Sequence, residues 1–281
     1  MTSRSLCLAL IAALAVPPAT GHGAETNALN GFLLAPKAFR AAAAKVLPSV
    51  VVIETYGGAT PARPKAKRPT GEGGAPVAQK PGEGPGTGLI ISADGHILTS
   101  TYHFVREQPV ITVVLPDDSQ QVARLLARDD RRKLCLLKIE GVRNLPVPEF
   151  ADPARLQIGQ YAVAIGFGYG GDEPTLAAGI VSALNRLAGR AVQTDAKLNP
   201  AHYGGPLIDI EGRVIGINVP LSPKTDETLG GTEWYDSGIG FAVPIGDPAT
   251  MIKLENVLLP ADRKSPWSDV RLPFSQEDSR P

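Results

Sequence analysis

Hydrophobic residues recur along this chain in short runs that are rich in Val, Ile and Leu and are separated by turn-forming residues. Runs of this kind are typical of β-strands, and few of the stretches between them show helical spacing. Asp94-Gly95 and Glu211-Gly212 each lie between two runs, and they indicate tight hairpins because glycine accepts a positive φ. About a dozen such strands predict an all-β sandwich or pair of barrels rather than a parallel sheet with crossover helices. The predicted strands span residues 50–55, 87–92, 96–100, 110–115, 121–128, 134–139, 161–167, 176–187, 192–196, 207–210, 213–219 and 238–243.

Helical spacing is clear in one place, before the first strand. Phe39, Ala43 and Val46 recur on one face of the segment from Pro36 to Leu47. This predicts a short amphipathic helix that starts at the proline, within an N-terminal segment over residues 22–45. At the other end of the chain, residues 247–281 predict one further helix and then a polar tail, too short for a second domain of usual size.

The first 21 residues have the pattern of an export signal. Arg4 precedes an apolar run from Leu6 to Val16, and small residues follow it. The run is shorter than the roughly 18 apolar residues of a membrane span, so residues 1–21 predict a cleaved signal peptide. We therefore expect an exported protein, periplasmic or extracellular, with no stable membrane span after cleavage. The alternative is a signal that is retained as an anchor.

Residues 57–86 differ from the rest of the chain in composition. They are dominated by Gly, Pro, Ala, Lys and Arg, with Val77 as the only large aliphatic residue. Such a segment cannot bury enough apolar surface to offset its ordering entropy, so a long disordered loop is expected here.

Charge and cysteine content exclude two further possibilities. Lys and Arg total 28 and Asp and Glu total 28, so the totals show no basic excess for binding nucleic acid. Cys7 leaves with the signal, and Cys135 alone remains in the mature chain. Stability must then come from packing rather than from an internal disulfide.

Several motifs, in a fixed order, resemble the HtrA/Deg-type trypsin-like serine proteases. The most similar are the hairpin at 86–99 and the run Ala178-Gly179-Ile180-Val181-Ser182-Ala183. The resemblance implies a trypsin-like fold of two six-stranded antiparallel β-barrels over residues 46–246, with a cleft between the barrels and no cofactor. It also indicates a member without the peptide-binding PDZ domain that usually follows the barrels. The remaining motifs lie at residues 129–139, 161–166, 193–207 and 238–244.

The positions that match the family's catalytic triad carry the wrong residues. Tyr203 stands where the family has its nucleophilic serine, and Lys133 stands where it has the aspartate that orients the histidine. A phenol with a pKa of about 10 is a poor replacement for an activated serine, and a cation repels an imidazolium. His103 arrives one residue late, so it reaches the catalytic histidine position only if the loop before it bulges. A new catalytic cluster of these side chains is a weaker alternative.

Two neighbouring segments complete the predicted site. Ala201, His202 and Tyr203 match the oxyanion turn, but Ala201 replaces a glycine, and a Cβ at positive φ costs about 1 kcal/mol or forces another turn. The resemblance places a peptide cleft at Gly238, Ile239, Gly240, Phe241 and Ala242. No metal site is expected, because His103 and His202 have no third ligand at a defensible spacing.

These features favour a non-catalytic pseudoprotease over an enzyme. The expected partners are unfolded or extended peptides or envelope proteins, and the chain is expected to form a homo-oligomer. The alternative is an active serine-type endopeptidase of the cell envelope. A side-chain hydroxyl or thiol within about 3.2 Å of a histidine nitrogen in the cleft between the barrels would favour that alternative.

Overall fold

The computed structural model describes residues 22–56, 85–104, 110–168, 173–221 and 238–249. The predicted signal peptide, almost all of the predicted loop at 57–86 and most of the predicted C-terminal segment lie outside these residues. The chain forms two compact units, Met1–Lys37 and Ala38–Pro281, and both barrels belong to the second. Within the described part, no helix combines the length and hydropathy that membrane crossing requires.

Helix α1 is longer than predicted. It spans His22–Val46, so Pro36 lies inside the helix and not at its start. A proline removes one backbone donor but has a φ that suits a helix, which is why it interrupts the hydrogen bonding without ending the helix here. After Val46 the chain continues as the 3₁₀ turn η1 (Leu47–Ser49) and enters the first strand.

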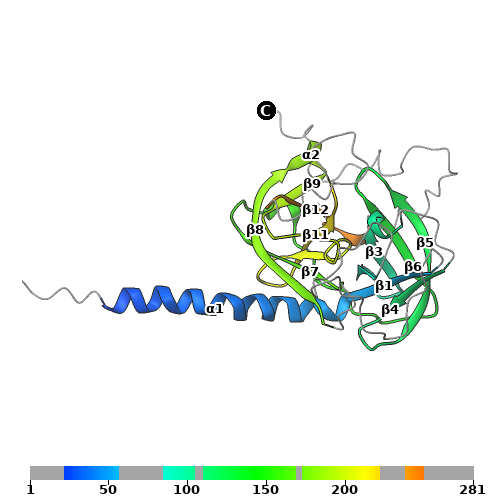
Figure 1. The fold of residues 1–281 in the computed structure, drawn as a ribbon, viewed down its shortest axis with the longest axis horizontal. Coiled ribbons are helices and arrows are strands. Elements are labelled where there is room, and N and C mark those ends of the chain that lie inside the picture. Colours follow the sequence, from blue (N-terminus) through cyan, green and yellow to red (C-terminus); the bar gives the residue numbers. More distant parts are fainter. Residues whose placement is uncertain (1–21, 57–84, 105–109, 169–172, 222–237, 250–281) are drawn as a thin grey trace, which may run out of the picture. The chain divides into compact units, whose positions relative to one another are not determined.

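The first six strands close into an N-terminal barrel in the order β1-β2-β3-β6-β5-β4 (Figure 1). Every pairing between them is antiparallel, and each strand lies close to its predicted position. These strands are β1 (Val50–Tyr56), β2 (Gly86–Ile90), β3 (His96–Ser100), β4 (Val110–Val114), β5 (Gln120–Asp129) and β6 (Leu134–Ile139).

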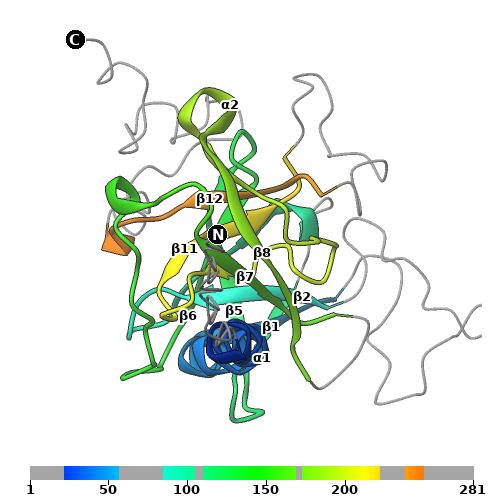
Figure 2. The ribbon, with the colours of Figure 1, turned by 90° about the vertical axis from the view of Figure 1, so that its left-hand side faces the viewer.

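The other six strands close into a C-terminal barrel in the order β10-β11-β12-β9-β8-β7, seen from another side in Figure 2. The short turn α2 (Arg186–Gly189) joins β8 to β9, and the 3₁₀ turn η3 (Pro153–Arg155) precedes β7. The predicted double six-stranded antiparallel barrel is confirmed. Its strands are β7 (Tyr161–Gly166), β8 (Thr175–Asn185), β9 (Ala191–Thr194), β10 (Pro206–Ile208), β11 (Val214–Val219) and β12 (Gly240–Pro244).

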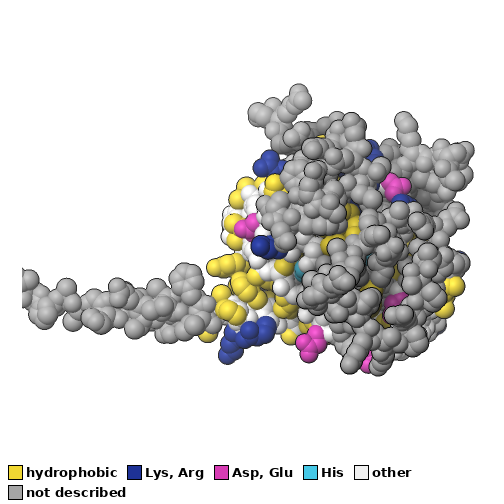
Figure 3. Space-filling model, in the orientation of Figure 1, with side chains coloured by type: hydrophobic (Ala, Val, Ile, Leu, Met, Phe, Trp, Pro, Cys, Tyr) yellow, Lys and Arg dark blue, Asp and Glu magenta, His cyan; other side chains and the backbone are white. Residues whose placement is uncertain are grey.

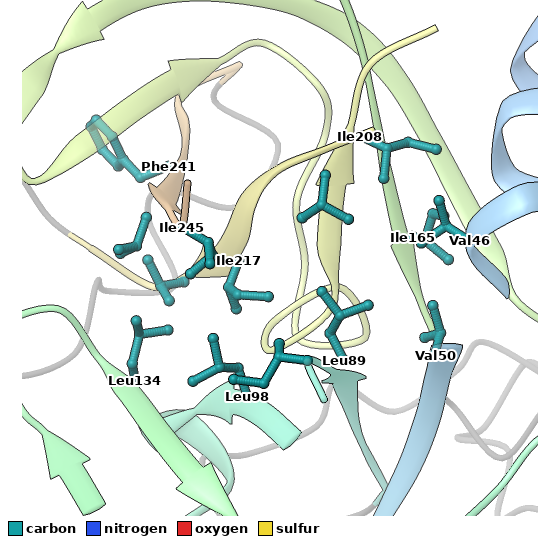
Figure 4. Packing of buried hydrophobic residues seen from close by; sticks show 14 of the residues in the cluster. Val46, Val50, Leu89, Leu98, Leu134, Ile165, Ile208, Ile217, Phe241 and Ile245 are labelled. Atoms are coloured by element: carbon teal, nitrogen blue, oxygen red, sulfur yellow. The ribbon is translucent and has the colours of Figure 1, made fainter. Parts of the chain in front are cut away.

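An aliphatic cluster joins the two barrels, and we call it the inter-barrel core (Figure 4). The end of α1 packs into it, and the Lys45 Nζ fixes that end by donating to the carbonyl oxygen of Glu211 at 2.9 Å. Burying these side chains removes apolar surface from water and holds the two barrels together. The side chains labelled in the figure are Val46, Val50, Leu89, Leu98, Leu134, Ile165, Ile208, Ile217, Phe241 and Ile245.

A second cluster fills the C-terminal barrel, and we call it the C-terminal barrel core. One of its members, Tyr102, comes from the N-terminal barrel and reaches across to it. This crossing side chain marks the place where the two barrels face each other at the candidate site. The buried members are Tyr102, Ala151, Leu156, Ala162, Ala164, Val181, Val192, Leu198, Tyr203, Leu207, Ile215 and Ala242.

Hydrophobic side chains also gather on the outer surface, over β7 and β8 (Figure 3). Tyr161 is 48% exposed and Leu176 is 40% exposed, and the Tyr161 ring lies 5.5 Å from that of Phe39 near the end of α1. Exposed apolar residues that cluster are typical of protein interaction surfaces.

Candidate functional site

Strand β3, which leads to His103, reaches its last residue without a bulge. Thr99 pairs with Cys135 and Ser100 with Leu134, and the register of β3 against β6 shows no shift. The 3₁₀ turn η2 (Thr101–His103) follows at once, with the Ser100 side chain accepting the Tyr102 N–H at 3.2 Å. Tyr102 is the third residue after Thr99, and His103 is the fourth.

Tyr102 packs directly against Tyr203. Their ring centroids lie 5.1 Å apart at an interplanar angle of 58°, and the two residues are only 2% and 6% exposed. Tilted aromatic pairs at this separation are favourable. An aromatic contact therefore joins the two barrels at the candidate site.

His103 lies beside this pair and contacts the backbone rather than a hydroxyl group. Its Nε2 is 2.8 Å from the carbonyl oxygen of Tyr203. The ring presses on Gly86, where an added Cβ would lie 2.5 Å from the ring carbon Cγ, so this contact requires a glycine. Burial lowers the pKa of His103 to about 4, and the imidazole is neutral near pH 7. Since a carbonyl only accepts, Nε2 carries the proton and cannot take one from a nucleophile.

The hairpin between β5 and β6 supplies a cation and a carboxylate that is already paired. Lys133 has a left-handed backbone (φ 60°), its carbonyl oxygen accepts the N–H of Thr101 at 2.9 Å, and burial lowers its pKa. Asp129 is fully buried, with Oδ2 3.0 Å from Nη1 of Arg132 and Oδ1 accepting backbone N–H groups of the same hairpin. Its carboxylate stabilises this hairpin.

The turn at 199–203 uses its own backbone donors internally. The N–H of Ala201 donates to the Asn199 side-chain oxygen at 2.9 Å, that of His202 to the Asn199 carbonyl at 2.9 Å, and that of Tyr203 to the Pro200 carbonyl at 3.3 Å. Ala201 is not among the described non-glycine residues with positive φ, so the turn has adopted another form, one of the two outcomes expected for a Cβ there. An oxyanion hole needs N–H groups that point at the substrate, and these point back into the turn.

Packing holds this turn in place. Thr87 on β2 donates through Oγ1 to the Ala201 carbonyl at 2.8 Å, and Gly168 leaves room for the Ala201 methyl, which a Cβ there would approach to 2.3 Å. His202 is buried, and burial lowers its pKa to about 4. Its Nδ1 lies 3.1 Å from the Asn199 side-chain oxygen, so the ring supports the turn.

The predicted peptide cleft differs from expectation in its hydrogen bonding. Phe241 and Ala242 pair with β9 on one side and with β11 on the other, so they offer no free strand edge. The Leu198 side chain covers Gly240, where an added Cβ would lie 2.8 Å from it. At Gly238 (φ +75°), no atom of the described residues beyond its chain neighbours lies within 4 Å of an added Cβ. Any exposed part of the cleft in the described chain therefore lies before β12.

A serine, an aspartate and a histidine do meet elsewhere, in the turn before β3. The Ser92 Oγ lies 2.9 Å and the Asp94 Oδ1 3.0 Å from Nδ1 of His96, and the serine also donates to the aspartate. Both partners contact the same ring nitrogen, whereas a relay needs one on each. Among the described residues, no group of three His, Cys, Asp or Glu side chains could hold a metal ion.

Comparison with known proteins agrees with the double barrel. Residues 86–217 match the model of the trypsin-like peptidase domain. A solved structure, "HtrA-type protease AlgW with tripeptide", superposes with a TM-score of 0.58 at 27% identity over 77% of this chain and 62% of that one. The fold and the matched region define a protein of the trypsin-like peptidase class.

The curated relatives narrow this class to one family. The periplasmic serine endoprotease DegP of Escherichia coli K12 is 33% identical, over 84% of this chain and 55% of its own length. The putative serine protease HhoB of Synechocystis is 34% identical, over 72% of this chain and 49% of its own length. The chain belongs to the HtrA-type family of trypsin-fold proteins, and it spans about half the length of these relatives.

Tyr102 is a buried residue of the candidate site that the sequence analysis does not predict. A signal for it is present in the sequence, because in the family's motif the histidine is the third residue after the threonine, and the third residue after Thr99 is Tyr102. The sequence analysis instead predicts His103 for the catalytic histidine position, because an imidazole can act as a general base.

Proposed function

We propose that this chain is an exported, non-catalytic HtrA-type protein that binds extended peptides or protein partners in the cell envelope. The observation that supports it most is the Tyr102–Tyr203 ring pair, with the His103 Nε2 committed to the Tyr203 carbonyl. Both groups of the proton-transfer step are replaced at the positions where they would have to meet.

The replaced catalytic groups lower turnover jointly, because each one depends on the others. Acyl transfer needs a nucleophile, a base that takes its proton, a group that orients the base, and donors for the oxyanion. Here Tyr203, Tyr102 and Lys133 stand at the first three positions, and the N–H groups of Ala201 and Tyr203 are paired within the turn. Loss of a catalytic triad alone lowers turnover by about 10⁶-fold, or roughly 8 kcal/mol of barrier.

The location rests on two observations. Residues 1–21 have the pattern of an export signal, and the DegP relative carries the word periplasmic in its name. We propose the periplasm as the compartment.

Binding without cleavage is supported by the scaffold. Both barrels and the inter-barrel core are retained, and the similar AlgW structure was solved with a tripeptide. Because Leu198 and Tyr203 occupy the C-terminal barrel core, we expect weak affinity for extended peptides, on the order of 10 μM to 1 mM. The exposed face over β7 and β8 is a candidate surface for self-association, in line with the expected homo-oligomer.

The relatives' names favour the second candidate function, an active endopeptidase. Among the described residues, the Thr175 Oγ1 lies 3.5 Å from Nε2 of His202, but this hydroxyl donates to the Gly166 carbonyl at 3.0 Å, so its proton is not directed at the imidazole. The Cys135 thiol is fully buried, and burial raises its pKa to about 12, so it does not ionise near neutral pH.

Two assays on the purified full chain test the proposal. Casein cleavage and labelling by a fluorophosphonate are measured beside an active trypsin-like protease, and we expect neither above background. Titration with labelled unfolded peptides is expected to show saturable weak binding. Stoichiometric labelling of one residue would overturn the non-catalytic assignment, and absence of binding at millimolar peptide would overturn the binding role.

A further inference from the structure

One side chain in the C-terminal barrel has no hydrogen-bond partner among the described residues. Asn218 on β11 is fully buried, and both its amide oxygen and its amide nitrogen lack a partner there. A buried amide without partners is costly, and native structures keep few of them. Such a group indicates that something polar joins it in the working protein.

Strand register fixes where this amide points. Asn218 lies opposite Ala242 on β12, and residues directly opposite each other in an antiparallel pair share one face of the sheet. Ala242 belongs to the C-terminal barrel core, together with Tyr203 and Leu198. The neighbouring pair, Ile217 and Val243, lies on the other face, in the inter-barrel core. The Asn218 amide is therefore on the side of the barrel interior.

The backbone of Asn218 holds the candidate site itself. Its N–H donates to the Gly205 carbonyl at 2.9 Å, and its carbonyl accepts the Gly204 N–H at 2.8 Å. These two glycines directly follow Tyr203. On the two flanking strands Asn218 thus has a glycine and an alanine as neighbours, and neither carries a side chain larger than a methyl group.

We propose that Asn218 is a specificity residue that binds the primary amide side chain of a Gln or Asn in a bound peptide. One orphan atom accepts and the other donates, so a second primary amide satisfies both at once with two N–H···O bonds. A carboxylate lacks the donor, and an apolar side chain offers neither group. The inference rests on the proposed peptide-binding function and names its ligand class.

Entry of such a side chain requires local movement. Leu198 and Tyr203 are the core members that come from the segment between β9 and β10, which forms turns rather than strand. Side chains of a turn change rotamer more readily than those within the barrel wall, so we expect one of these two to give way to the ligand.

The test uses the full chain and short Gly/Ser peptides that carry a fluorescent label and one central residue: Gln, Glu or Met. These three side chains are similar in length and differ in hydrogen bonding. We expect the Gln peptide to bind about tenfold more tightly than the other two, which corresponds to about 1.4 kcal/mol. Asn218→Leu, an apolar replacement of similar size, is expected to abolish that preference.

Stability measurements separate a ligand site from a structural role. Removing an unpaired amide is expected to leave the thermal midpoint of Asn218→Leu unchanged or up to about 4 °C higher. A lower midpoint in every folded variant, with no peptide preference in the wild type, would mean that an ordered water satisfies the amide, and the proposal would be wrong. If Asn218→Leu does not fold, Asn218→Ala serves the same purpose.

Ile217→Val is the matched control, one residue away on the opposite face of β11. It is expected to keep the preference for Gln. Binding that shows no side-chain preference, or a preference that survives loss of the Asn218 amide, overturns the inference but leaves the binding function intact. No binding of any peptide overturns both.

Discussion

The two ends of strand β3 carry a histidine each, and they differ in what surrounds it. At the start of the strand, His96 contacts the Ser92 hydroxyl and the Asp94 carboxylate in a turn where the aspartate side chain is 64% exposed. Past its end, the buried His103 packs against Gly86 and the Tyr102 ring, and its Nε2 lies 2.8 Å from the Tyr203 carbonyl oxygen. The first end has the residue types of a catalytic triad. The second end lies where the family resemblance predicts the triad.

This difference shows that residue types alone do not make a site. At His96 the serine and the aspartate both contact Nδ1, so these two partners do not form a relay across the ring. At His103 the ring faces the other barrel, but its partner is an acceptor that holds the proton in place. Position comes from the fold, whereas chemistry depends on which atom of the ring meets which partner.

The largest expected effect is on reactivity at the second end. Tyr203→Ser alone is expected to stay at background in fluorophosphonate labelling, because His103 Nε2 remains bound to the backbone and Lys133 remains a cation. The triple variant Tyr102→His, Lys133→Asp and Tyr203→Ser is expected to label at least about 10³-fold faster than the single variant, since triad members act as a unit. Fast labelling of Tyr203→Ser by itself would show that His103 is the base.

Stability should also distinguish the two ends. Tyr102→Ala removes a buried ring that crosses between the barrels, and it is expected to lower the free energy of unfolding by about 3 kcal/mol. His96→Ala removes a smaller buried ring at the first residue of β3, and it is expected to cost less, about 1 to 2 kcal/mol. Urea unfolding of both variants measures this, and equal losses would contradict the assignment of Tyr102 as a packing residue.

The pH dependence of stability tests the burial of His103. Its pKa is about 4 in the folded protein against 6.5 as the ordinary value, so the unfolded chain binds this proton more readily. The stabilisation is complete above about pH 6.5 and is lost as the pH falls toward 4, by up to about 3 kcal/mol. We expect His103→Gln to show a shallower decline over this range than the wild type. Parallel curves would mean that His103 is accessible to solvent.

The smallest effect is expected at the exposed turn. Ser92→Ala removes a hydroxyl from a group of side chains that water can reach, and it is expected to change the free energy of unfolding by less than about 1 kcal/mol. Labelling by fluorophosphonate should stay at background in this variant and in the wild type. A loss of labelling specific to Ser92→Ala would reveal chemistry at the turn.

The strands were predictable because their signal is local. Alternating and β-branched runs such as Val110–Val114 and Leu134–Ile139 define strands without knowledge of their partners. Helix α1 was only partly predictable, since Pro36 reads as a helix start although a helix can also continue through it.

The site was predictable as a set of positions but not as a set of contacts. Counting along the motifs predicts the triad positions at Lys133 and Tyr203 and the turn at 201–203, and these assignments stay predictions. It could not show that Phe241 and Ala242 are paired on both sides, because strand pairing is a property of the closed barrel.

The sequence by itself determined the double barrel and the family resemblance, because short motifs of neighbouring residues carry both. The same motifs have no serine and no aspartate at the positions where the resemblance predicts them. Only the tertiary structure decided that Tyr102 meets Tyr203, that His103 donates to a backbone carbonyl, and that the Asn218 amide lacks a partner in the described residues. These contacts join residues that are distant in sequence, and a hydrogen bond or ring contact depends on distances of a few ångströms that only the packed barrels set.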